Sequence, residues 1–126
     1  MELKKRVQEQ QSSLIKLRRW FHQNPELSYQ EVNTQRKILD IVNAYEGLEV
    51  QESARTGLVV DLNPGMEKCL AIRADMDALP INEETKLSFG SNNSGVMHAC
   101  GHDAHMAILL TLLNILHKIP LKGSVR

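Results

Sequence analysis

A polar cluster that runs directly into an apolar segment constrains the fold of this chain more than any other feature. Residues 98–105 read His-Ala-Cys-Gly-His-Asp-Ala-His, and five of these eight side chains can bind a metal ion or carry a proton. The residues behind them are strongly apolar and predict a helix over residues 103–118, with Asp103 as its N-cap. We therefore expect the cluster to lie at the start of a helix that is buried on most sides.

The chemistry of this cluster suggests a divalent metal site. A thiolate from Cys100 and an imidazole from His102 can bind one ion together, because Gly101 lets the backbone bend between them. The alternative is a buried cysteine among scattered surface histidines. Three further side chains are candidates to lie around the ion or to contact a substrate carboxylate: His98, Asp103 and His105.

A second cluster, of two carboxylates, follows an apolar strand predicted over residues 69–72. Asp75 and Asp77 are two residues apart, so in an extended chain their side chains point the same way. Ligands of open α/β sheets bind beyond the carboxyl ends of strands, which is where this pair would lie. The pair could supply a metal ligand or a carboxylate that orients a ligand histidine. An ordinary loop with a salt bridge to Arg73 is the alternative.

The first part of the chain predicts a long amphipathic helix. Apolar residues recur at alternating steps of four and three over residues 2–22, and Asn24-Pro25 ends the pattern. Two polar residues lie in the joint that follows. We interpret His22 as a satisfied structural histidine and Glu26 as a solvated side chain.

A second helix and a set of short strands follow. Ser28 and Glu31 fit a capping box at the start of this helix. Gly47 can adopt a left-handed backbone conformation and is expected to end the helix. Asn63-Pro64-Gly65 is a sequence typical of a turn, so the strands on either side of it are predicted to form a hairpin. The predicted strands are residues 48–51, 58–62 and 69–72. Helices, then strands, then another helix predict an α/β fold, with a mixed sheet and helices packed against it.

Length, charge and cysteine content limit the classes of protein. The 126 residues are enough for one domain, and 15 basic residues balance 15 acidic ones, so no net charge attracts nucleic acid or a membrane surface. The longest apolar run is too short to span a bilayer. Two cysteines make no disulfide framework, so we expect a cytoplasmic location.

Three stretches of the sequence resemble one known family and occur in that family's order. They are similar to the amidohydrolase branch of the dinuclear-metal aminoacylases and carboxypeptidases, which includes hippurate hydrolases, N-acetyl-diaminopimelate deacetylases and auxin-conjugate hydrolases. The stretches are residues 18–28 (Arg-Arg-Trp-Phe-His-Gln-Asn-Pro-Glu-Leu-Ser), 70–81 (Leu-Ala-Ile-Arg-Ala-Asp-Met-Asp-Ala-Leu-Pro-Ile) and 95–105 (Gly-Val-Met-His-Ala-Cys-Gly-His-Asp-Ala-His).

The resemblance implies a fold, a reaction and a set of roles. The fold would be the first part of a zinc-peptidase-like catalytic domain. The intact enzyme would hydrolyse the amide bond of a small N-acyl amino acid or related conjugate, with one or two divalent ions, manganese or zinc. By resemblance, Cys100 and His102 are metal ligands and Asp77 is the catalytic aspartate that steers the metal centre. Asp75 lies where other branches carry a metal-binding histidine.

The sequence also departs from the family pattern. By resemblance, family members continue after the strand that residues 123–126 begin, with a Glu-Glu pair that supplies the general base, two more histidine ligands and a lid domain. Glu83 and Glu84 do not occupy the position of that base. We therefore expect residues 1–126 to be the amino-terminal part of a catalytic domain whose remainder is the partner.

Two rival interpretations remain. The first is a catalytically silent fragment with a partial metal site or only a packing role. The second is a thiol or redox protein that uses Cys100, which is disfavoured because no cysteine lies two or three residues away.

Overall fold

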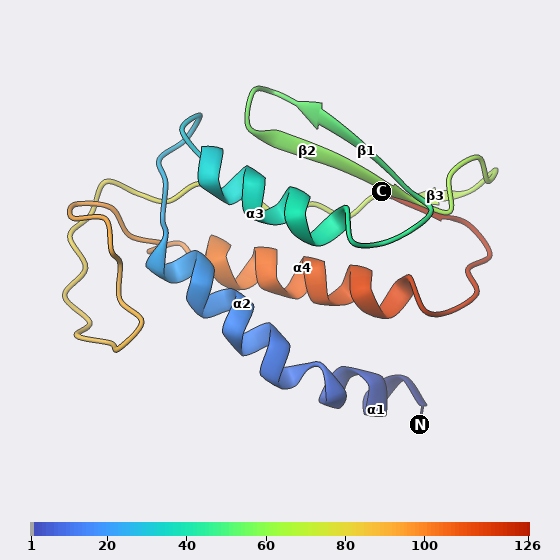
Figure 1. The fold of residues 1–126 in the computed structure, drawn as a ribbon, viewed down its shortest axis with the longest axis horizontal. Helices are drawn as coiled ribbons and strands as arrows, with labels where there is room; N and C mark the ends of the chain where they lie inside the picture. Colours follow the sequence, from blue (N-terminus) through green and yellow to red (C-terminus); the bar gives the residue numbers. More distant parts are fainter. Residues whose placement is uncertain (1) are drawn as a thin grey trace.

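The computed structural model describes residues 2–126 and has the predicted α/β architecture, with helices packed against a mixed four-stranded sheet (Figure 1). Within these residues every helix is too short or too polar to cross a lipid bilayer. In chain order the elements are α1 (Glu2–Glu9), α2 (Gln11–Gln23), α3 (Val32–Val42), β1 (Leu48–Ser53), β2 (Gly57–Leu62), β3 (Cys69–Leu70), α4 (His102–Leu116) and β4 (Ser124–Val125).

The strand order of the sheet is β1-β2-β4-β3. β1 and β2 form an antiparallel hairpin, β4 lies antiparallel to β2, and β3 pairs with β4 in parallel. The predicted hairpin between residues 58–62 and 69–72 is therefore wrong, because β4 lies between these two segments. The real hairpin turn uses positive φ angles of 49° at Ala54 and 70° at Arg55, residue types that give no turn signal.

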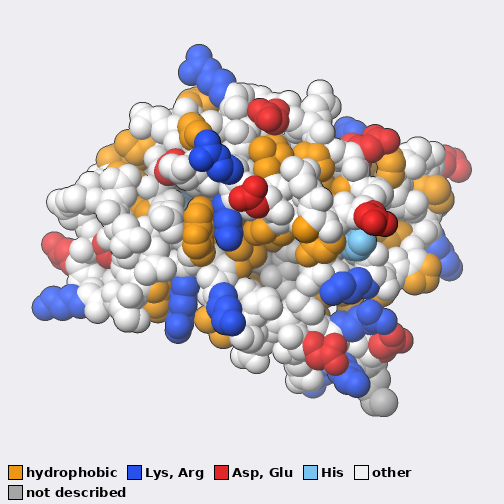
Figure 2. Space-filling model, in the orientation of Figure 1, with side chains coloured by type: hydrophobic (Ala, Val, Ile, Leu, Met, Phe, Trp, Pro, Cys, Tyr) orange, Lys and Arg blue, Asp and Glu red, His pale blue; other side chains and the backbone are white. Residues whose placement is uncertain are grey.

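One apolar core joins α2, α3 and α4 to the sheet. Its fully enclosed members are Phe21, Ile38, Val42, Met106 and Leu110. Leu48, Val50, Leu58 and Val60 extend the same core from one face of the hairpin. On the face drawn in Figure 2, other hydrophobic side chains reach the surface in patches between lysines and arginines.

The first predicted helix is two helices. α1 ends before Gln10, whose side-chain oxygen accepts a hydrogen bond of 2.7 Å from Asn114 Nδ2 at the far end of α4. α1 itself buries no residue, and Leu3 and Val7 remain 60% and 51% exposed. α2 ends at Gln23, before Asn24-Pro25 as predicted. The apolar periodicity therefore spans both helices, but only α2 uses it to pack.

The start of α3 is capped from a distance. Glu26 Oε1 accepts from the Thr34 amide at 2.6 Å and hydroxyl at 2.7 Å, and Oε2 accepts from the Asn33 amide at 3.0 Å. The predicted capping box of Ser28 and Glu31 is wrong, because Glu31 instead accepts a 2.6 Å hydrogen bond from Thr56. Glu26, which we had expected to be solvated, therefore satisfies the free donors of the first turn of α3.

Replacing Glu26 by alanine is expected to lower the free energy of unfolding by roughly 1–2 kcal/mol, because charge-assisted capping bonds are lost. Urea unfolding followed by the fluorescence of Trp20 measures the change. Glu84→Ala, at an exposed loop position, is the matched control and should be neutral. Equal stability of the two variants would contradict the assignment of Glu26 as the cap.

Candidate metal centre

Backbone pairing brings the three motif stretches together. Ala78 N donates to Glu26 O at 2.8 Å, and Leu79 and Met97 exchange backbone hydrogen bonds of 2.9 and 3.0 Å. These bridges align the end of the segment after β3 with the joint behind α2 and with the turn before α4. The two predicted clusters therefore meet at the amino-terminal end of α4.

His102, the first residue of α4, lies against both aspartates of the second cluster. Its Nδ1 is 2.8 Å from the backbone oxygen of Asp77 and 3.1 Å from Asp77 Oδ1. Its Nε2 is 4.0 Å from Asp75 Oδ2. As predicted, Asp75 and Asp77 are on the same side of the chain. Arg73 also pairs with Asp75 at 2.8 Å, so the salt bridge of the alternative interpretation is present as well.

These contacts select one tautomer of His102. A backbone carbonyl can only accept a hydrogen bond, so Nδ1 must carry the proton that reaches Asp77. The lone pair of a neutral ring is then on Nε2, which is the arrangement of a metal-ligating histidine whose other nitrogen is held by a backbone or carboxylate oxygen. Asp77 thus orients the ring of His102.

Cys100 lies in the turn immediately before α4 and is a free, exposed thiol. Gly101 separates it from His102 and adopts the left-handed conformation, with φ 80°. A Cβ at Gly101 would meet no atom within 4 Å, so glycine is required there for its backbone conformation and not for space.

Asp103 is not the N-cap that we predicted. That position belongs to Gly101, and the Asp103 carboxylate is fully buried in the first turn of α4. Its Oδ2 accepts from Arg18 Nε at 2.9 Å and from His22 Nδ1 at 2.7 Å. Asp103 therefore ties α4 to α2.

His22 extends this contact to the loop before α4. It is 2% exposed, and its Nε2 is 2.9 Å from Glu83 Oε1. Only an imidazolium has donors on both nitrogens, which matches the two carboxylates on either side of it. The four groups of this network, which are Arg18, His22, Glu83 and Asp103, then carry two positive and two negative charges. The Arg18 side chain is 34% exposed, and the other three side chains are buried.

Glu83 is held in its charged form. Burial raises its pKa, but hydrogen bonds from Thr85, His22 and the Ser91 amide outweigh this effect and together lower the pKa to about 2. Its carboxylate is therefore fully engaged in holding the loop and the His22 ring.

The two other histidines of the cluster differ from each other. His98 is 4% exposed, its burial lowers its pKa to about 4, and neither of its ring nitrogens has a hydrogen-bond partner in residues 2–126. His105 is exposed, and its ring centroid is 6.2 Å from that of His102. The cluster thus contains an exposed imidazole close to His102 and a buried, neutral one.

The described residues do not by themselves form a complete set of metal ligands. Across residues 2–126, no group of three or more His, Cys, Asp and Glu side chains is arranged to hold an ion. Cys100 and His102 are suitable donors by type, and His102 is oriented as a ligand, but a catalytic site needs about three protein ligands.

Sequence reasoning missed the buried network around Asp103. The one local signal was the spacing of Arg18 and His22, which are four residues apart and so share one face of α2. Glu83 gave none, because its loop has no periodicity. The interpretation of His22 as a satisfied structural histidine agrees with its two partners.

The network makes stability depend on pH in acid. Glu83 is charged in the folded state down to about pH 2, so its contribution is complete above the ordinary pKa of 4.5 and is lost as the pH falls from there toward 2. The free energy of unfolding of the native protein minus that of Glu83→Gln should therefore shrink by up to about 3 kcal/mol between pH 6 and pH 2.

Urea titrations at several pH values in this range measure that difference. The same subtraction with Glu84→Gln, the exposed neighbour, is the control and should not vary with pH in this way. A pH-independent difference for Glu83→Gln would contradict the assigned network.

Comparison with known proteins points to one family. The model of peptidase family M20/M25/M40 matches residues 71–125. The N-acyl-L-amino acid amidohydrolase of Geobacillus stearothermophilus is 41% identical over 99% of the chain and 35% of that protein. The N-acetyldiaminopimelate deacetylase of Priestia megaterium is 47% identical over 91% of the chain and 31% of that protein. Thermostable carboxypeptidase 1 of Saccharolobus solfataricus is 42% identical over 99% of the chain and 33% of that protein.

Solved structures agree with the sequence matches. A crystal structure from methicillin-resistant Staphylococcus aureus superposes with a TM-score of 0.89 and 43% identity, over 94% of the chain and 32% of that protein. The Bacillus subtilis YXEP protein is described as a dinuclear metal binding peptidase of the M20 family. It superposes on the chain with a TM-score of 0.78 and 42% identity, over 90% of the chain and 33% of that protein. The chain spans about a third of the length of these relatives. In sequence and in fold, the chain is similar to about a third of the length of these proteins of peptidase family M20/M25/M40, as its resemblance to the amidohydrolase branch implied.

Proposed function

We propose that residues 1–126 are the amino-terminal part of a metallohydrolase catalytic domain, and that the intact enzyme hydrolyses the amide bond of N-acyl amino acids or related conjugates. The orientation of His102 by Asp77 carries this proposal, because it leaves Nε2 without a hydrogen-bond partner closer than Asp75, at the half-buried start of α4. Relatives named as an amidohydrolase and a deacetylase support the reaction class. The remainder of the domain is the expected partner.

In this proposal Cys100 and His102 hold a divalent ion, manganese or zinc. Sulfur and imidazole donors suit zinc, whereas the family resemblance favours manganese. The bound ion would polarise the scissile carbonyl and make water a stronger nucleophile. Asp77 keeps the His102 ring in its ligating tautomer, and Asp75, 4.0 Å from Nε2, is a further candidate donor.

The other candidates take supporting roles. His105, exposed beside His102, is proposed to contact the substrate carboxylate. Asp103 and the neutral His98 are proposed to support the site from its buried side. Glu83 is not suited to act as the general base, because its oxygens are bound to His22, Thr85 and Ser91.

A catalytically silent fragment is the second candidate. The lack of any three-donor group within residues 2–126 favours it for this chain by itself. We also propose a small-molecule substrate, no nucleic-acid or membrane partner, and a cytoplasmic location, which is supported by the two cysteines, both free.

Metal binding by the purified chain tests the ligand assignment. We expect one Co²⁺ ion to bind, with a sulfur-to-cobalt absorption band, and Cys100→Ala to abolish that band. Cys69→Ala is the matched control, because Cys69 is the other free, exposed thiol. Retention of metal stoichiometry and absorption by Cys100→Ala would show that the assignment is wrong.

Activity tests whether the described residues are sufficient. The isolated chain is expected to hydrolyse N-acetyl or N-benzoyl amino acids feebly at most, because the carboxylates against His102 are Asp75 and Asp77 and neither matches the family's base. Release of the free amino acid, measured by chromatography, gives the rate. Robust turnover would refute the claim that essential groups lie outside residues 1–126.

A further inference from the structure

A groove with a volume of about 520 Å³ lies between α2, α3 and α4, away from the candidate metal centre. In Figure 1, α4 runs between the two other helices. The part of α4 that lines the groove begins at Leu110, eight residues after His102 and so about 12 Å farther along the helix axis. The volume is in the range of sites that bind small molecules, roughly 300–1,000 Å³.

The floor of this groove is apolar and firmly held. It is formed by side chains that belong to the core or pack against it, namely Leu17, Trp20, Ile41 and Leu110. Near the break between α1 and α2, the hydrogen bond of 2.7 Å from Asn114 Nδ2 to Gln10 Oε1 joins two further lining residues. The shape of the groove therefore depends on packed helices and not on a surface loop.

The charge of the groove is entirely positive. Among residues 2–126, its only charged lining side chains are Lys16 of α2 and Lys37 of α3, and neither takes part in an ion pair. The half-buried Lys37 places its Nζ 5.1 Å from the centroid of the Trp20 ring, which keeps this charge at the groove. Two of the three helices thus each supply one unpaired cation.

Hydroxyl groups add hydrogen-bond donors to these charges. Burial raises the pKa of the Tyr45 phenol, so this lining residue keeps its proton and can donate at neutral pH. Ser13 lines the groove three residues before Lys16, on the same face of α2. An anionic group in the groove would therefore meet ammonium groups and hydroxyls, and no lining carboxylate.

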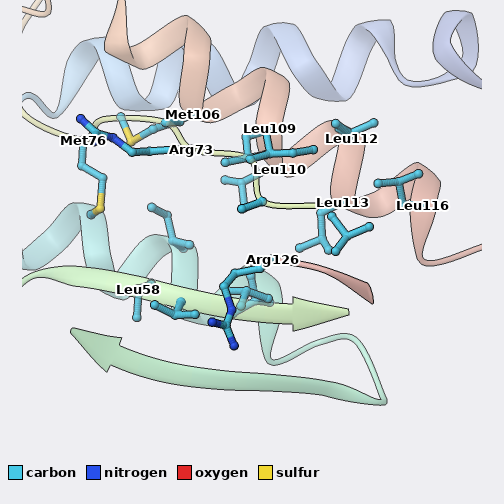
Figure 3. A pocket seen from close by; sticks show the side chains of 18 residues that line it. Leu58, Arg73, Met76, Met106, Leu109, Leu110, Leu112, Leu113, Leu116 and Arg126 are labelled. Atoms are coloured by element: carbon cyan, nitrogen blue, oxygen red, sulfur yellow. The ribbon is translucent and has the colours of Figure 1, made fainter. Parts of the chain in front are cut away.

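The groove between α4 and β2 lacks this charge pattern. Leucines of α4 line it, as Figure 3 shows for Leu113 and Leu116. Its two arginines, Arg73 and Arg126, are each paired with an aspartate. An uncharged apolar molecule fits either groove, whereas an anion is attracted to the one with the unpaired lysines.

We propose that the groove between α2, α3 and α4 is a binding site for a small aromatic anion, with one carboxylate or phosphate group on an aromatic ring. The anionic group would lie between Lys16 and Lys37, and the ring would pack on the apolar floor beside Trp20. None of these residues takes part in the proposed hydrolysis, so this site can be tested independently of the metal centre.

Isothermal titration calorimetry with the full 126-residue chain tests the proposal. The probes are benzoate and phenyl phosphate, and the tighter of the two identifies the anionic group. Benzamide keeps the flat ring without the charge, and inorganic phosphate keeps the charge without the ring. We expect the tighter probe to bind at least about tenfold more strongly than either control, because charge-assisted hydrogen bonds or ring burial are lost.

Trp20 reports where the probe binds. It is the only tryptophan of the chain, so its indole N–H gives a single nuclear magnetic resonance signal. We expect this signal to shift and to saturate with the dissociation constant found by calorimetry. Failure of both anions to bind, equal binding of a control, or binding without the Trp20 shift would overturn the proposal.

Two lysine variants test the charges themselves. Lys16→Met and Lys37→Met keep an apolar stem and should each weaken binding by about fivefold or more. Lys122→Met, at an exposed position outside the groove, is the matched control and should bind as the native chain does. Circular dichroism verifies each fold. If Lys37→Met disturbs the packing of Trp20, the exposed Lys16→Met decides, and its unchanged affinity would refute the assignment.

Discussion

The contact of the buried Asp103 carboxylate with Arg18 and His22 is the interaction on which the packing of α2 against α4 depends. The carboxylate is fully enclosed, and its charge is compensated by Arg18 and His22 from α2. A buried charge without such partners would destabilise the fold by several kcal/mol, on the order of 3–5. The position of α2 against α4 is therefore set by electrostatics as well as by the apolar contacts around Phe21. Because His22 also reaches Glu83, the same carboxylate fixes the loop in front of the candidate site.

The residue next to Asp103, His102, is the first residue of α4 and is only half-buried. The ring is oriented by Asp77, which comes from the extended segment after β3 and not from the network itself. Two different sets of contacts thus support the candidate site. One is the set of four charged groups, three of them buried, that holds α4 against α2, and the other is the pair of Asp77 oxygens that orients the His102 ring. The half-buried ring of His102 therefore has different partners from the buried carboxylate of Asp103, one residue away.

Much of this arrangement could be predicted from the sequence, and the exceptions have physical reasons. Local periodicity and residue type predict three features correctly. These are the start of α4, the end of α2 before Pro25, and the shared direction of Asp75 and Asp77. The cap of α3 by Glu26 does not, because the capping side chain lies outside the sequence window in which caps normally occur. The hairpin turn was missed because Ala54 and Arg55 occupy left-handed positions that usually go to glycine or asparagine. His22 and Glu83 are 61 residues apart in the sequence, and no local sequence pattern predicts a contact over such a separation.

The second edge of β2 also affects how copies of this chain behave toward one another, because β4 pairs with it only at Leu62. An unpaired edge with apolar neighbours is a template for intermolecular β-pairing, which leads to aggregation at high concentration or during synthesis. Here the ion pair between Arg126 and Asp61, a residue of β2, places charges beside that edge, where charged side chains oppose such pairing. The chain thus combines a strand edge that can template its own self-association with charges that restrain it.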